Sequence, residues 1–325
     1  MIGAGPKQRN SFARNSEKQN VILVSGNPPI AYERERSACV GGEVKVAGSV
    51  PQYRPRSMRL LSSLSCALVF LTGFVAGFGP PPASAQDVSA DRIAQRLMDA
   101  HGADAFAQVP LLRFDFVVEG DGTPGATMRH LWDRRTGDYR LEWTQNDSLF
   151  VAILNVNDVT DDVPAGAVYH NGEALSDTYG RQLKKDAYRR FINDTYWLLA
   201  PLKVMDAGVN RSYVADLSDD THDVLHLTFG DVGLTPDDEY WLFVNRETGR
   251  LDRWMFHLQG MPDRADPAPF DWTEYKTLET PNGPVQLATR HQSETDPLAI
   301  LTQAIAFPTE APPNAFSRPQ PMLDE

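Results

Sequence analysis

Cysteine is absent from the chain after Cys66, and the only other cysteine is Cys39. Residues 86–325, which we expect to form the mature protein, can therefore hold no disulfide and no thiol-based catalytic site. Basic residues are also few in this part, with 21 Lys and Arg against 39 Asp and Glu, a net charge of −18 with His neutral. This excess of negative charge disfavours nucleic acid and anionic membrane surfaces as partners.

Sequence patterns that carry catalysis are missing as well. No glycine-rich phosphate loop is present, and no serine lies in a Gly-x-Ser-x-Gly pattern. The acidic turn Asp158–Asp161 lacks the glycine and the closing glutamate of a calcium-binding loop. We therefore expect a protein that is not an enzyme, with no catalytic residues and no cofactor.

His222 and His226 are four residues apart, which would be a metal-ligand spacing on a helix. Leu225, Leu227 and Phe229 alternate around His226, and this alternation indicates a strand. On a strand the Cα atoms of the two histidines would be about 13 Å apart, too far to share one ion. We expect two exposed histidines here and no metal site.

The strongest targeting feature is an uncharged apolar stretch at residues 60–78 that directly follows Arg59. Three prolines at residues 80–82 and the small-residue pattern Ala83-Ser84-Ala85 come next, which is the layout of a cleavable signal peptide. The stretch approaches the ~20 residues that span a bilayer. Its serines and glycines and the small-residue site favour cleavage after Ala85 over an uncleaved membrane anchor.

Residues 1–57 show no hydrophobic periodicity and carry nine Lys or Arg against four Asp or Glu. A signal peptide normally lies at the N-terminus, so we predict that Met58 is the true start and that residues 58–85 are the signal peptide. Residues 86–325 would form a single domain with an irregular tail from about residue 309. The mature protein would be periplasmic or secreted, with no transmembrane segment.

Two helices are predicted in the mature part. Ser89 can cap a helix over Ala90–His101, which has a stripe of apolar residues and ends before Gly102. Helical spacing returns at Gly180–Leu199, with apolar residues on one side and basic residues on the other. We expect Pro201 to end this second helix.

The rest of the mature chain alternates with period two and is divided by glycines and prolines, which predicts a meander of about ten or eleven antiparallel strands, a number good to one or two. The expected strands are 112–118, 128–132, 139–143, 149–156, 167–170, 213–217, 224–229, 240–245, 251–258, 270–278, 285–292 and 301–307. A sheet this long must curl to bury its apolar face. The expected fold class is mainly β with two helices, in which a strongly curved antiparallel sheet, or half-barrel, is capped by the helices and encloses a cavity.

The order of these elements resembles the LolA-like superfamily, the periplasmic carriers of lipoproteins and their relatives. The resemblance covers most of residues 90–308 and rests on the leading helix and on the segments His130–Trp132, Tyr139–Trp143, Tyr169–Gly172, Tyr240–Asn245, Gly249 and Trp254–Leu258. It implies a helix-capped half-barrel that holds acyl chains. The segment Phe191–Pro201 is also similar to a signature of uncharacterised secreted proteins thought to share this fold, which implies no activity.

Aromatic residues are the most prominent feature of the predicted strands, and all six tryptophans lie after residue 86. Each alone is typical of core packing, but together they could line an apolar cavity. Tyr196 and Trp197, at the end of the second helix, are our preferred contacts. The expected ligand-binding residues are Trp132, Trp143, Phe191, Tyr196, Trp197, Trp241, Trp254 and Phe256.

Two functional hypotheses follow. The first is an exported binding or carrier protein for an acyl chain, a lipid or lipoprotein, or another apolar ligand. The alternative is an envelope module that binds a protein partner through its acidic surface or a sheet edge, without a small-molecule ligand. A hydrolase whose residues meet only in the fold is a third and less favoured hypothesis.

Overall fold

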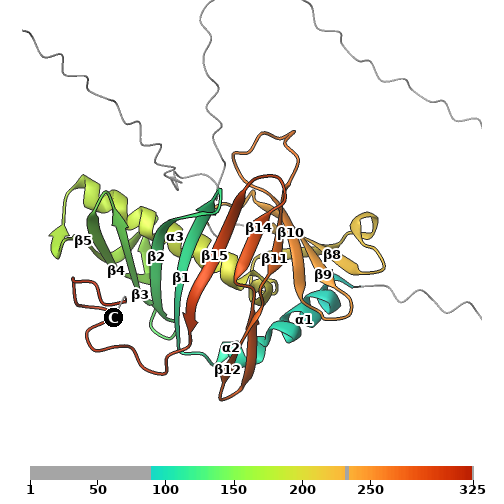
Figure 1. Cartoon of the computed structure of the whole chain (residues 1–325), viewed down its shortest axis with the longest axis horizontal. Helices are drawn as coiled ribbons and strands as arrows, with labels where there is room; N and C mark the ends of the chain where they lie inside the picture. The colour runs from blue at the N-terminus through green and yellow to red at the C-terminus, as the bar shows by residue number, and fades with distance from the viewer. Residues whose placement is uncertain (1–88, 231–233, 324–325) are drawn as a thin grey trace, which may run out of the picture. The chain divides into compact units, whose positions relative to one another are not determined.

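The structure, a computed structural model, describes residues 89–230 and 234–323 (Figure 1). The predicted signal peptide, its cleavage site after Ala85 and the predicted extension 1–57 lie outside these residues. Within the described part, the expected fold class is confirmed: the chain is mainly β, with a large curved antiparallel sheet and helices. None of the described helices is both long enough and apolar enough to span a membrane.

Helix α1 (Ala90–His101) has the predicted bounds. The Ser89 side chain accepts a hydrogen bond from the backbone N–H of Arg92, and Gly102 ends the helix with a left-handed φ of 75°. The backbone carbonyl of Pro284 would lie 2.1 Å from a Cβ at Gly102, so a side chain has no room there. A short helix that the sequence did not reveal, α2 (Ala103–Ala107), follows directly.

Thirteen strands form one sheet in the order β6-β5-β4-β3-β2-β1-β15-β14-β11-β10-β9-β8-β7, and every neighbouring pair is antiparallel. The chain builds the sheet outward from β1 to β6, crosses to the other edge and returns inward to β15, which pairs with β1. The sheet is not closed into a barrel, and register shifts in β1, β4 and β10 mark irregularities that help it bend. The strands are β1 (Leu111–Gly120), β2 (Thr123–Asp133), β3 (Asp138–Gln145), β4 (Ser148–Thr160), β5 (Val163–His170), β6 (Glu173–Leu175), β7 (Val209–Tyr213), β8 (His222–Phe229), β9 (Glu239–Asn245), β10 (Leu251–His257), β11 (Ala268–Thr273), β14 (Arg290–Ser293) and β15 (Leu298–Ala306).

Two long strands predicted near the C-terminus are each divided in the structure. The predicted strands 270–278 and 285–292 are wrong as continuous elements, because β12 (Lys276–Thr280) and β13 (Gly283–Leu287) leave the large sheet and form a separate hairpin. Glu274 adopts a left-handed φ of 53°, which breaks the extended backbone between β11 and β12. The hairpin instead packs Val285 and Leu287 into the core beside α1 and α2.

The prediction of a strand at residues 213–217 is wrong for most of this range. The structure has β7 up to Tyr213 and then a short 3₁₀ helix, η1 (Ala215–Leu217). Ser218 stabilises this turn, because its hydroxyl donates to the Val214 carbonyl and accepts from the Val224 backbone N–H. Side chain to backbone bonds of this kind compete with strand pairing.

Helix α3 (Thr178–Lys203) begins at the capping residue Asp177, whose carboxylate accepts from the Gly180 N–H. The prediction that Pro201 ends the helix is wrong, since α3 continues to Lys203. Proline removes one helical hydrogen bond, but Leu199 and Leu202 are buried on either side of it and packing holds the last turn in place. Helix α3 packs on β4, β5 and β6 near its start and, through Trp197, on β10 and β11 near its end (Figure 1). It therefore crosses one face of the sheet.

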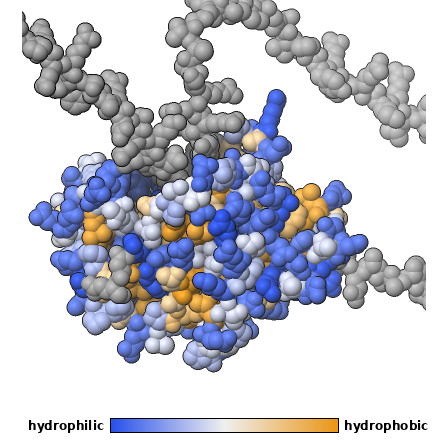
Figure 2. All heavy atoms as spheres, viewed as in Figure 1, coloured by the Kyte–Doolittle hydropathy of each residue, from blue (hydrophilic) through white to orange (hydrophobic). Residues whose placement is uncertain are grey.

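The opposite face of β1, β2 and β3 carries the C-terminal segment, residues 307–323, which has neither helix nor strand. Arg140 is fully buried beneath this segment and donates to the carbonyls of Ala315, Arg318 and Gln320. Elsewhere on the face shown in Figure 2, hydrophobic residues form small groups among hydrophilic ones. We call residues 307–323 the C-terminal strap.

Candidate functional site

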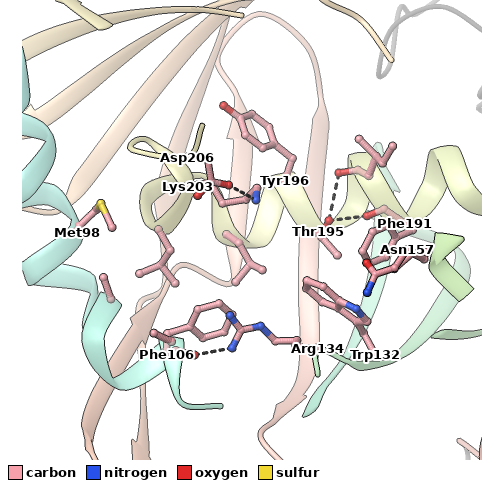
Figure 3. A pocket seen from close by; sticks show the side chains of 16 residues that line it. Met98, Phe106, Trp132, Arg134, Asn157, Phe191, Thr195, Tyr196, Lys203 and Asp206 are labelled. Atoms are coloured by element: carbon pink, nitrogen blue, oxygen red, sulfur yellow. Dashed lines mark hydrogen bonds and ion pairs between the residues drawn. The ribbon is translucent and has the colours of Figure 1, made fainter. Parts of the chain in front are cut away.

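A pocket of about 490 Å³ lies between α1, α2, α3 and the end of the sheet where β2 turns into β3 (Figure 3). Ligand sites for small molecules commonly measure 300–1,000 Å³, so the pocket has the size of such a site. Its polar lining is limited to Arg134, Asn157, Thr195, Lys203 and Asp206, and its apolar lining comprises Met98, Ala103, Phe106, Ala107, Trp132, Val156, Phe191, Ile192, Tyr196, Leu199 and Leu202.

Helix α3 supplies one wall. Ile192, Thr195, Leu199 and Leu202 follow one another at intervals of three or four residues, so they lie on the same side of the helix. Thr195 donates its hydroxyl hydrogen to the Phe191 carbonyl and thus presents little free polarity. The wall is therefore mainly apolar.

An aromatic corner closes the pocket on the side of β2. The rings of Trp132 and Phe191 meet edge to face with centroids 4.9 Å apart, and Phe191 meets Tyr139 at the same distance. The indole Nε1 of Trp132 is buried, and among the described residues it has no hydrogen-bond partner. This corner joins the helix to the sheet.

Arg134 lies in the turn between β2 and β3 and lines the pocket. Its Nη1 donates to the carbonyls of Phe106 and Val109, at 2.5 and 2.7 Å, and these bonds tie the turn to the end of α2 (Figure 3). The guanidinium carbon is 4.1 Å from the centroid of the Phe106 ring. Burial lowers the pKa of Arg134, but an arginine keeps its positive charge in a protein.

The second cation of the pocket is neutralised. Lys203, near the end of α3, forms an ion pair with Asp206, and both side chains are more than two-fifths exposed. They therefore mark a solvated rim. Arg134 also lines the pocket, and no carboxylate among the described residues pairs with it.

A buried polar cluster ties α3 to the sheet beside the pocket. His130 Nδ1 lies 2.8 Å from the hydroxyl of Tyr139, and His130 Nε2 lies 3.2 Å from Asp194 Oδ2, off the line of a hydrogen bond. His130 and Asp194 are both fully buried, and Arg190 lies 3.7 Å from the same carboxylate oxygen. Burial lowers the pKa of His130, which favours the neutral form of this histidine.

The eight residues predicted to bind a ligand are divided among three environments. Trp132, Phe191 and Tyr196 line the pocket. Trp241 lies on the outer face of the sheet, stacked on His226 at 4.7 Å. The other four, namely Trp143, Trp197, Trp254 and Phe256, are buried in the packed core.

Tryptophans that we expected to line a cavity are instead packed against other aromatic side chains in the core. Trp197 contacts Trp254 at 4.6 Å, Phe270 at 5.1 Å and Phe256 at 6.0 Å between ring centroids. The interior around Trp197 is therefore packed. The pocket lies along the same C-terminal half of α3, on the side that carries Ile192, Leu199 and Leu202.

Several pocket residues were missed by the sequence analysis. Phe106 lies on α2, which is too short to show periodicity, and Arg134 lies in a turn. Leu202 and Lys203 follow Pro201, where the helix was expected to have ended. The apolar spacing of Ile192, Leu199 and Leu202 was the one signal that could have indicated the wall.

The two histidines with metal-ligand spacing lie on β8, as expected, but they are not fully exposed. His222 contacts Asp252 at 3.1 Å and His226 contacts Glu239 at 2.8 Å, and each side chain is about one-quarter exposed. The acids cover part of both histidines, Trp241 stacks on His226, and Phe243 meets His222 edge to face. In residues 89–230 and 234–323, no group of three or more His, Cys, Asp or Glu side chains is arranged to hold a metal ion.

Comparison with known proteins does not assign the chain to a family. No protein-family model matches it, and no curated protein matches it. Among solved structures, the crystal structure of a DUF1329 family protein from Desulfovibrio piger ATCC 29098 matches with 9% sequence identity and a TM-score of 0.38, covering 70% of this chain and 97% of that chain. The LolA-like relationship stays a prediction, and function must be argued from the pocket.

Proposed function

We propose that the protein is an exported, non-enzymatic binding or carrier protein that holds an acyl chain, a lipid or another apolar ligand. The observation that supports this most is the pocket of about 490 Å³ with its mainly apolar lining. Transfer of apolar surface from water into such a pocket contributes roughly 25 cal/mol per Å². The expected signal peptide at residues 58–85 and the lack of a catalytic pattern favour the same function.

The carrier function is preferred over a protein-interaction module. An interaction surface normally presents a contiguous apolar patch. The large hydrophobic side chains exposed in the described residues are Tyr179, Met205 and Leu217, which lie near the two ends of α3 and on η1. They are placed on separate segments, whereas the pocket gathers its apolar groups in one concavity.

A variant that fills the pocket tests this proposal. Ala107 is exposed at the end of α2 and lines the pocket, so Ala107→Trp adds bulk there without disturbing the core. We expect the variant to bind a fluorescent fatty acid at least about tenfold more weakly than the delipidated unmodified protein, a change of about 1.4 kcal/mol. Fluorescence titration measures the affinity.

Gln108→Trp is the matched control, because Gln108 is the next residue and does not line the pocket. It should bind the probe like the unmodified protein. Failure of the unmodified protein to take up the probe, together with no lipid found by native mass spectrometry of protein from its natural source, would contradict the proposal. Equal binding by all three proteins would place the ligand elsewhere.

A further inference from the structure

The Arg134 guanidinium has one edge in use and one edge free. Both hydrogens of Nη1 are directed to backbone carbonyls, those of Phe106 and Val109. Nε and Nη2 have no hydrogen-bond partner among the described residues, and neither is a sealed, solvent-inaccessible nitrogen. These two nitrogens form the side of the guanidinium that binds a carboxylate with two parallel hydrogen bonds.

The acids nearest in the chain are committed to other groups. Asp133 binds Arg135 with both oxygens, at 3.1 and 2.7 Å. Asp138 accepts from the Thr136 hydroxyl at 2.9 Å and from Asn155 at 3.0 Å. The turn therefore leaves the charge of Arg134 uncompensated inside a partly desolvated pocket, a situation that an anionic ligand would relieve.

The Trp132 ring lies beside Arg134 and lines the same pocket. The guanidinium carbon is 5.8 Å from the centroid of the Trp132 ring, and the buried indole Nε1 of that ring has no partner. The Nε1 atoms of Trp254 and Trp272 in the packed core also lack a partner among the described residues, so the inference rests on Arg134 and not on this indole. The apolar face of α3, with Ile192 and Leu199, forms the opposite wall.

We propose that the ligand of this pocket is an anionic amphiphile, whose carboxylate is bound by Nε and Nη2 of Arg134 while its hydrocarbon chain lies against α3. This inference rests on the binding function proposed above and adds the chemical class of the ligand. The carbonyls held by Nη1 fix the guanidinium in place, which limits the entropy lost on binding. Arg134 would then determine specificity, and the apolar wall would supply affinity.

A matched ligand series tests the proposal on the delipidated, unmodified protein. A long-chain fatty acid, the alcohol of equal chain length and the corresponding alkyl phosphate are titrated at pH 8, where the fatty acid is ionised. We expect the acid to bind about tenfold or more tightly than the alcohol, as charge-assisted hydrogen bonds require. Equal affinities for acid and alcohol would overturn the anionic class, and tighter binding of the phosphate would overturn the assignment of a carboxylate.

Arg134→Gln should abolish the preference for the acid and leave binding of the alcohol unchanged. Arg135→Gln is the control, because Arg135 is 58% exposed and pairs with Asp133 outside the pocket. Persistence of the acid preference in Arg134→Gln would contradict the role of this residue. If Arg134→Gln fails to fold, the ligand series on the unmodified protein still decides the chemical class of the ligand. If the unmodified protein binds none of the three ligands, the carrier function itself is refuted.

Discussion

Two histidines that do not line the pocket are buried and have lowered pKa values. His291 is fully buried against Trp272 and Trp197, has no hydrogen-bond partner among the described residues, and its pKa is lowered by burial to about 3. His101 contacts the Leu97 carbonyl at 2.8 Å and the Tyr275 hydroxyl at 3.3 Å, and burial lowers its pKa to about 4. Both are neutral in the folded protein at neutral pH.

These histidines make the folded state sensitive to acid. Below pH 6.5 the unfolded chain takes up protons on both residues, whereas the folded chain does not until about pH 4 at His101 and pH 3 at His291. The free energy of unfolding therefore falls as the pH falls, by up to about 1.4 kcal/mol per pH unit for each histidine. Urea unfolding between pH 7 and 4.5 measures this slope.

His291→Phe should reduce that slope by up to about 1.4 kcal/mol per pH unit, because one proton-linked group is removed. Trp272→Phe is the control, since it loosens the packing around His291 and leaves both histidines in the chain. It should lower stability at every pH with little change of slope. An unchanged slope in His291→Phe would show that this histidine is not neutral in the folded state.

Among the elements, the C-terminal strap depends on a buried ion pair of β3. Arg140 and Glu142, 0% and 1% exposed, contact each other at 2.5 Å. Arg140 binds three strap carbonyls, and Glu142 accepts from the backbone N–H groups of Met322 and Leu323. A small apolar cluster of Leu111, Leu131 and Ala315 lies between strap and sheet.

Arg140→Gln should lower the free energy of unfolding by about 3–5 kcal/mol, because it leaves Glu142 buried without its partner. Chemical denaturation measures this loss. Arg189→Gln, which breaks the partly exposed pair with Asp186, should cost no more than about 1 kcal/mol.

Removal of residues 311–325 tests whether the strap and Arg140 act together. In the shortened chain both Arg140 and Glu142 become accessible to water, so Arg140→Gln should then have a much smaller effect. Equal effects of Arg140→Gln in the full and shortened chains would show that the strap does not depend on this pair.

The sequence predicted those elements that local patterns determine. Helix α1 has a capping serine and a terminal glycine, and its bounds were predicted to the residue. Most strands also followed from alternation. The division of residues 270–292 into two sheets could not be predicted, because it depends on the packing of Val285 and Leu287 against α1 and α2.

The candidate site was less accessible to prediction than the fold. Alternation shows that Trp254 and Trp132 lie on strands, but it does not show that one is sealed in the core while the other faces a pocket. Pocket and core use the same residue types, and the difference depends on where α3 crosses the sheet. Arg134 has no local signal, since its role depends on carbonyls that α2 places beside it.

At the scale of the whole described molecule, the protection of backbone amides from hydrogen exchange should vary across the sheet. Strands β1 and β15 lie at its centre and are paired on both sides, whereas β6 and β7 are its edges. We expect the slowest amide hydrogen exchange in β1, β2 and β15 and the fastest in β6 and β7. Exchange followed by mass spectrometry measures this, and equal protection of edge and centre would show that the sheet opens as one unit.

Strands β1 and β15 pair in the sheet but are synthesised at different times. Roughly 180 residues separate the end of β1 from the start of β15, and at about 5–20 residues per second their synthesis takes roughly 10 to 40 seconds. During this interval β1 lacks its second partner, and an unpaired strand edge readily joins other chains. Pairing of β1 with β15 must therefore wait for the last strand of the sheet, and the free edge of β1 is open to other chains until then.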